Sequence, residues 1–139
     1  MNYGGRCPPY NIIPNKSEQV SAARRGMKEP DSYKPEEKLI VYGSLAPGGS
    51  NAFMFKGLEG TWHRCRIWGH MRRWRGFKSF QWDPKGPEHE AWLLASPALP
   101  RIFPELDDFE GDEYQRLVIP ARVGDAWVLA YIYEGKCFE

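Results

Sequence analysis

One glutamate of this chain stands where helix electrostatics disfavours an acid. Pro104 and Gly111 flank the segment around it, which predicts a short helix that begins at Pro104 and ends at Gly111. Glu110 is then the last residue of the helix, at the negative end of the helix dipole. At roughly 100° per residue, Glu110 lies about 40° around the helix from Leu106. Its carboxylate therefore faces partly toward the apolar stripe of the helix.

A carboxyl group in that place has the properties of a general base. Apolar neighbours and the carbonyl end of a helix raise the proton affinity of a carboxylate, and a base works best when its pKa lies near the operating pH. The alternative is that the whole acidic run is a solvated face. That alternative suits Glu105, Asp107 and Asp108, which point away from the apolar stripe, better than it suits Glu110. We therefore take Glu110 as the candidate catalytic residue.

A glycine-containing loop is the second candidate. Residues 39–42 form a short apolar run of strand length that ends abruptly at Gly43. Gly43 lets the backbone approach a ligand closely, and the consecutive amides of Gly43, Ser44, Leu45 and Ala46 are able to converge on an anionic oxygen such as a carboxylate. Taken alone, a plain turn is the more frequent explanation of this pattern.

These residues need a framework, and most of the remaining sequence predicts strands. The expected strands are residues 39–42, 61–67, 76–82, 89–95, 114–121 and 126–133, with a one- or two-turn helix capped by Ser50 or Asn51 and a single helical patch that follows Ser96 and Pro97. About six strands with one or two short helices indicate an α+β fold, a small, closed or nearly closed mixed β-barrel.

The 139 residues are enough for one domain with a real core. We expect residues 1–37, which are polar and interrupted by prolines, to form a poorly determined or partly disordered extension, with a possible short helix over residues 17–27. The domain itself is expected to span residues 38–139. No apolar run approaches the roughly 20 residues of a membrane helix, and residues 1–10 lack a secretory signal, so we expect a soluble, cytoplasmic protein.

The order and spacing of several motifs resemble the γ-glutamylcyclotransferase-like superfamily, including its AIG2-like and γ-glutamylamine cyclotransferase-like members. The motifs are Tyr42-Gly43-Ser44-Leu45, Leu106-Asp107-Asp108-Phe109-Glu110-Gly111, Tyr114-Gln115-Arg116 and Ala130-Tyr131-Ile132-Tyr133. The resemblance covers about residues 38–135 and implies a compact mixed barrel with a cavity.

The resemblance also implies a reaction. The loop from Tyr42 to Leu45 would hold a γ-glutamyl moiety, and Glu110 would accept a proton from its α-amine. The amine would then attack the γ-carbonyl, giving 5-oxoproline and a released amine or amino acid, with no metal or cofactor. Tyr114 would hydrogen-bond near Glu110 and contribute to substrate binding, and Arg116 would be structural.

Two features separate the chain from the family pattern. Residues 69–77 lack the Tyr-Pro segment common in the family, and a usual glycine is replaced near Glu90. Both departures bear on the predicted substrate more than on the predicted fold. Because many proteins of this shape have no demonstrated reaction, the alternative function is a non-catalytic module that binds a small ligand or a protein.

A basic and aromatic segment, residues 62–82, supports a third hypothesis. Basic residues interleaved with aromatic ones suit the stacking and phosphate contacts of a nucleic-acid binder. The more frequent explanation is a pair of strands with Trp inward and Arg outward, so nucleic acid is the less favoured partner. Residues 1–82 carry a net charge of +8 and residues 83–139 one of −7, which favours two mutually attractive faces.

A metal site is not expected from this sequence. His63 and Cys65 share a strand face, but His70, His89, Cys7 and Cys137 show no paired ligand spacing. Structural zinc normally takes four ligands. The sequence indicates neither the oligomeric state nor the leaving group.

Overall fold

Strands make up most of the described part of the chain, residues 34–137 of this computed structural model. The strands are β1 (Lys38–Val41), β2 (Thr61–Trp74), β3 (Phe77–Trp82), β4 (Glu88–Ala95), β5 (Tyr114–Val123) and β6 (Ala126–Gly135), and the helical segments are η1 (Pro35–Glu37), η2 (Ala52–Phe55) and α2 (Leu99–Glu110). Residues 1–33, with the expected extension and short helix, lie outside the described residues.

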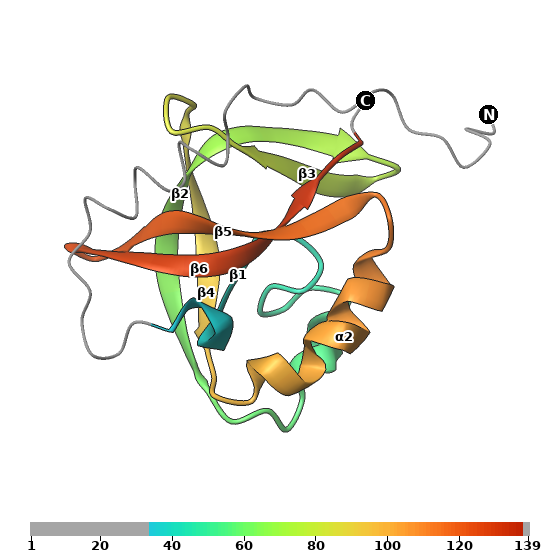
Figure 1. The fold of residues 1–139 in the computed structure, drawn as a ribbon. Helices are drawn as coiled ribbons and strands as arrows, with labels where there is room; N and C mark the ends of the chain where they lie inside the picture. Colours follow the sequence, from blue (N-terminus) through green and yellow to red (C-terminus); the bar gives the residue numbers. More distant parts are fainter. Residues whose placement is uncertain (1–33, 138–139) are drawn as a thin grey trace.

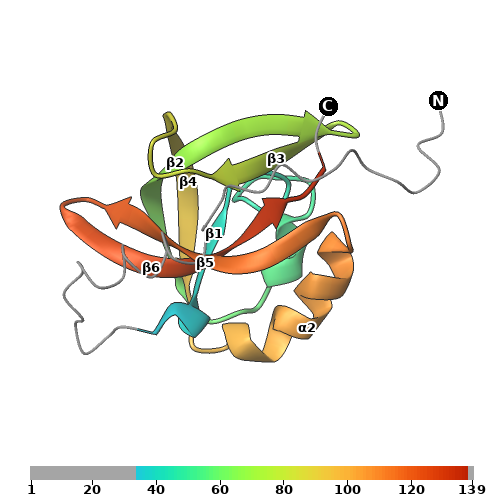
Figure 2. The same cartoon turned by 45° about the horizontal axis from the view of Figure 1, so that its top comes forward.

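Five of the strands close into a barrel. The order is β2, β4, β1, β6 and β5, and β5 returns to β2 at the pair Arg66 and Arg122. Pairing of β1 with β6 is parallel and all other pairs are antiparallel, so the barrel is mixed. Within residues 34–137, β3 pairs only with β2 and lies outside the barrel, as the hairpin at the top of Figure 2 shows. The predicted α+β mixed barrel is confirmed.

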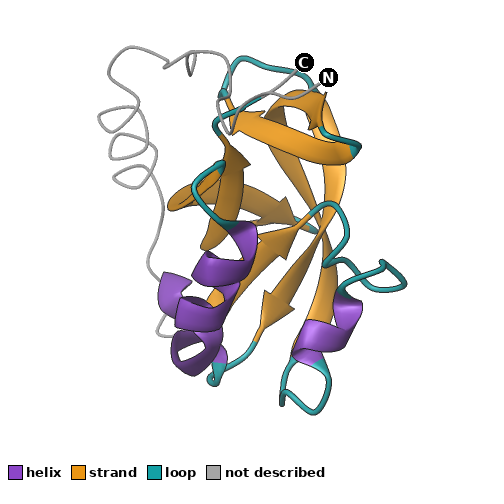
Figure 3. Ribbon diagram, turned by 90° about the vertical axis from the view of Figure 1, so that its right-hand side faces the viewer, coloured by secondary structure: helices purple, strands orange, loops and turns teal. Residues whose placement is uncertain are grey.

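Alternation along β1 divides the hydrophobic core in two. Successive side chains of a strand point to opposite faces. Ile40 therefore packs inside the barrel, whereas Leu39 and Val41 pack on the outside with residues of α2 and η2. Figure 1 shows α2 beside the barrel, and Figure 3 shows the helical segments in the lower half of the molecule with the strands extending above them. The strand that leads into the Gly43 loop is thus buried on both faces.

Helix α2 starts at Leu99, which agrees with the helical patch expected after Ser96 and Pro97. The predicted start at Pro104 is wrong, because Pro100 takes the place in the first turn that suits a residue without an N–H. Pro104 lies inside the helix. The predicted end is confirmed: Gly111 has a φ of 74° and donates its N–H to the Asp107 carbonyl at 3.0 Å, so Glu110 is the last helical residue.

The basic and aromatic segment forms one long strand and its hairpin partner. Strand β2 continues to Trp74, seven residues beyond its predicted end. Trp74 and Trp82 are buried, while Arg64 and Arg66 are exposed, which confirms the strand-pair interpretation for these positions. The two buried indoles are not available for stacking on bases. No helix among residues 34–137 is long and apolar enough to cross a membrane.

Candidate active site

A cavity of about 310 Å³ opens where the loop after β1 meets the C-terminal end of α2. Strand β3 and the first residues of β5 complete its wall. The lining residues are Ile40, Val41, Tyr42, Gly43, Ser44, Leu45, Asn51, Phe77, Lys78, Phe109, Glu110, Glu113, Tyr114 and Tyr133. All six site residues predicted from the sequence lie in this one cavity.

Glu110 contributes a carboxyl group with an unusual proton affinity. Burial raises its pKa from 4.5 to about 7. No hydrogen bond or ion pair to its carboxylate is found among the described residues, so nothing offsets the cost of removing the charge from water. A carboxyl group with a pKa near neutrality exists in both protonation states at physiological pH. It is suited to accept and then return a proton.

The loop after β1 lines this cavity with three residues, Gly43, Ser44 and Leu45, whose backbone N–H groups have no partner among the described residues. The N–H of Ala46 instead donates to the Gly43 carbonyl at 3.0 Å, so its predicted part in binding an anionic oxygen is wrong. Asn51 fixes the loop, since its side-chain amide donates to Ser44 Oγ at 2.9 Å and its backbone N–H donates to the Ser44 carbonyl at 2.8 Å.

Tyr42 braces the loop through its hydroxyl group. The hydroxyl donates to the Tyr133 carbonyl at 2.6 Å and accepts from the Phe80 N–H at 3.2 Å. Burial is the main cause that raises the pKa of Tyr42 well above its usual value. Because both contacts are internal, Tyr42 offers the cavity its ring and not its hydroxyl. The residue joins β1, β3 and β6 at the point where the loop begins.

Tyr114 lines the cavity with Glu110, and its hydroxyl group bonds to the backbone of β3. Its hydroxyl donates to the Lys78 carbonyl at 3.1 Å and makes no hydrogen bond with Glu110. Burial and the nearby carboxylates of Glu110 and Glu113 raise the pKa of Tyr114 to about 12. Tyr114 therefore stays protonated and fastens β5 to β3 beside the catalytic candidate.

Comparison with known proteins gives no match to a protein-family model and no match to a curated protein. Solved structures do match. Bacillus subtilis YkqA superposes with a TM-score of 0.60 at 16% identity, over 73% of this chain and 36% of YkqA. The Arabidopsis thaliana protein At5g39720.1 gives 0.57 at 19% identity, over 71% of this chain and 68% of that protein. A mouse AIG2-like protein gives 0.53 at 19% identity, over 74% and 79% of the two chains.

The match to the AIG2-like protein covers most of both chains and identifies the architecture. The chain has the γ-glutamylcyclotransferase-like fold. This confirms the resemblance seen in the motifs. At these identities the likeness concerns the fold, so what the cavity residues do is argued from their own geometry.

Asp107 of this γ-glutamylcyclotransferase-like fold is exposed, as the sequence predicted. It also has a role that the sequence did not predict, because its Oδ1 accepts hydrogen bonds from Tyr133 Oη at 2.6 Å and Arg116 Nε at 2.9 Å. Arg116 is also stacked over Phe103, 4.1 Å from the ring centroid, which agrees with its expected structural role. The network ties α2 to β5 and β6 one turn before Glu110. The bonds join residues 9 and 26 positions apart, so no local pattern in the sequence predicts them.

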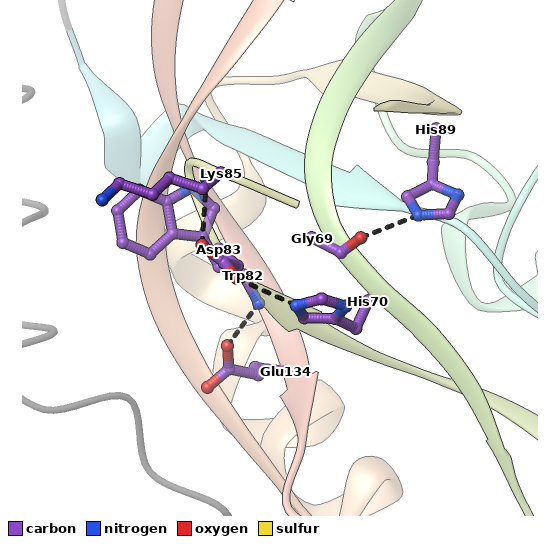
Figure 4. Close-up of polar contacts among 7 residues, drawn as sticks. All are labelled: Gly69, His70, Trp82, Asp83, Lys85, His89 and Glu134. Carbon is purple, nitrogen blue, oxygen red and sulfur yellow. Dashed lines mark hydrogen bonds and ion pairs between the residues drawn. The ribbon is translucent and has the colours of Figure 1, made fainter. Parts of the chain in front are cut away.

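Away from the cavity, His70 of β2 and His89 of β4 have separate partners (Figure 4). His70 Nε2 lies 2.9 Å from Asp83 Oδ2, and His89 Nε2 lies 2.9 Å from the Gly69 carbonyl oxygen. The buried Glu134 carboxylate accepts a backbone hydrogen bond from β3 at 2.7 Å. In residues 34–137, no three His, Cys, Asp or Glu side chains come together as metal ligands. These contacts hold the strands of the cyclotransferase-like fold together.

The raised pKa of Glu110 predicts a pH-dependent stability that is separate from any activity. The folded state binds the proton more tightly than the unfolded state, so the free energy of unfolding falls as pH rises from about 4.5 to about 7. The shift corresponds to at most about 3 kcal/mol, and partial solvent contact reduces the expected loss to about 1 to 2 kcal/mol. Glu110→Gln removes this loss, so urea unfolding at several pH values should show the variant gaining relative stability above pH 5.

Glu105→Gln is the matched control, since Glu105 is exposed on the same helix. Its unfolding curve should follow the wild type at every pH. Parallel pH profiles for wild type and Glu110→Gln would contradict the raised pKa.

Proposed function

We propose that this protein cyclises γ-glutamyl amines, amides or peptides to 5-oxoproline, with Glu110 as the acid and base. The observation that carries the proposal is the shared cavity. A carboxyl group with a pKa of about 7 lines it together with Gly43, Ser44 and Leu45, whose N–H groups are unpaired within residues 34–137. A γ-glutamyl group offers complementary chemistry, with an amine for the base and carboxylate and carbonyl oxygens for the amides.

The reaction needs one proton acceptor that later becomes a donor. Glu110, in its carboxylate form, takes a proton from the α-amine of the substrate. The amine nitrogen then attacks the γ-carbonyl carbon and forms the five-membered ring. As the tetrahedral intermediate collapses, the bond to the leaving nitrogen breaks, and Glu110 returns the proton to that nitrogen. The products are 5-oxoproline and a free amine, with no net change in protons.

The protein supplies orientation and hydrogen-bond donors. The attacking amine and the γ-carbonyl belong to one substrate molecule. Holding the γ-glutamyl group in the conformation that closes the ring therefore gives much of the acceleration. The loop amides would bind the substrate oxygens and stabilise negative charge that develops on the γ-carbonyl. Tyr42 and Tyr114 keep the loop, β3 and β5 in place around the substrate.

The test is a panel of γ-glutamyl compounds with product detected by mass spectrometry. We expect 5-oxoproline and the free amine in equal amounts from at least one member, at a rate well above the spontaneous reaction. The panel should include γ-glutamyl amines, amino acids and dipeptides. Saturable binding of panel members without product would favour the non-catalytic binding module. Absence of product from the whole panel would overturn the enzymatic proposal.

A further inference from the structure

A second cavity, of about 540 Å³, adjoins the first. The two share the stretch from Val41 to Ser44 together with Phe77 and Lys78. The charged and aromatic residues that line only the second cavity are Arg64, Arg73, Glu90 and Trp92. A molecule bound beside Glu110 therefore has room to extend past the Gly43 loop into this second space. There the β2–β3 hairpin faces the loop.

Two cations in this second cavity stand directly opposite each other. Arg73 of β2 and Lys78 of β3 are register partners in the antiparallel hairpin, so their side chains leave the same face. Like charges in this relation are destabilising. Neither has an acidic partner within residues 34–137, although Arg75, two residues from Arg73, pairs with Glu113 at 3.5 Å. An arrangement that costs stability and lines a cavity suits a bound anion.

The other charged groups of this cavity neutralise each other. Arg64 lies 2.7 Å from Glu90, and its guanidinium is stacked over Trp92 at 4.6 Å from the ring centroid. The charge left over is therefore that of Arg73 and Lys78. Trp92 and the half-exposed Phe77 add apolar surface. The cavity thus combines a net positive charge with room for a side chain.

We propose that the second cavity receives the leaving group of the reaction and that Arg73 and Lys78 bind a carboxylate on it. This inference rests on the proposed function. Lys78 lines both cavities, and its Cβ lies 3.8 Å from the place where a Cβ on Gly43 would stand, so its stem runs beside the loop. The preferred substrates are then γ-glutamyl amino acids or peptides with a free carboxylate. Simple γ-glutamyl amines lack the group that these cations recognise.

The test compares two substrates that differ by that carboxylate alone, γ-glutamyl-alanine and γ-glutamyl-ethylamine. The wild type should show a higher kcat/KM for γ-glutamyl-alanine. In the double variant Arg73→Gln, Lys78→Met the ratio of the two values should fall about tenfold to a hundredfold, as expected for the loss of a hydrogen-bonded charge. Lys85→Met is the control, since Lys85 is exposed in the turn after β3 and lines neither cavity. It should keep the wild-type ratio.

Equal losses for both substrates would overturn the inference, because the cations would then serve the glutamyl carboxylate that both substrates carry. A wild type without preference would also overturn it. If neither substrate gives 5-oxoproline, the proposed function is wrong, and the inference is then tested by binding alone. The affinities of both compounds are measured for Glu110→Gln with and without the double substitution. A preference for γ-glutamyl-alanine that disappears with the two cations supports it. Equal affinities contradict it.

Discussion

Replacement of Glu110 by Gln is expected to lower kcat for 5-oxoproline formation by about 100-fold to 10,000-fold, the usual contribution of a positioned acid and base. Gln has nearly the same shape as Glu but neither accepts nor returns the proton. Because no described residue bonds to the Glu110 carboxylate, the change leaves no partner unpaired and should preserve the fold. The loss should therefore appear in kcat, measured by product formation at saturating substrate.

The pH profile gives this prediction a second, independent measurement. Below pH 7 the Glu110 carboxyl group of the free protein is mostly protonated and cannot act as a base, so wild-type kcat/KM should rise with pH around a midpoint near 7. The residual rate of Glu110→Gln should lack that midpoint. Glu105→Gln, exposed on the same helix, should keep both the wild-type rate and the wild-type midpoint. Unchanged turnover by Glu110→Gln would exclude Glu110 as the base.

Local patterns in the sequence were enough for the main elements of the fold. The apolar run before Gly43 predicted a strand, and β1 is that strand, buried on both faces. Gly111 predicted the end of α2, since a residue in the left-handed region commonly closes a helix. The start at Pro104 was wrong because two prolines, Pro100 and Pro104, both fit a first turn, and local rules do not rank them.

The sequence predicted the two parts of the candidate site separately. Only the resemblance of the motifs to a known family indicated that the two parts lie together. Glu110 was marked by its position at a helix end, and Gly43 by its position after a strand. Their meeting depends on the barrel, in which β1 pairs in parallel with β6 and α2 packs on the outer face of both. The hydrophobic periodicity of either segment alone does not show that the two segments meet.

The contacts that brace the site were not predictable from the sequence. Tyr42 bonds across β3 and β6, and Asp107 bonds to Tyr133 and Arg116. Each bond depends on strand register over long separations, and a shift of one residue would turn every side chain to the other face. The position of Arg73 directly opposite Lys78 was not predictable for the same reason, because it depends on the register of β2 and β3.

Helix α2 positions Glu110 mainly through buried apolar side chains. Leu99, Phe103 and Leu106 are each no more than 4% exposed and pack against the outside of the barrel. Leu106 lies one turn before Glu110 on the same side of the helix. The burial of the catalytic candidate therefore depends on the packing of this residue.

Leu106→Ala is expected to reduce the free energy of unfolding by about 2 to 5 kcal/mol, because it removes buried methyl and methylene groups and leaves a cavity. Asp108→Ala, at an exposed position on the same helix, is the control and should change stability by no more than about 0.5 kcal/mol. Urea unfolding at pH 5 measures both changes while Glu110 is mostly protonated. Similar losses for the two variants would show that α2 does not depend on its apolar face. A loss confined to Leu106→Ala would show that the apolar face of α2, which packs on the barrel one turn before Glu110, stabilises the fold.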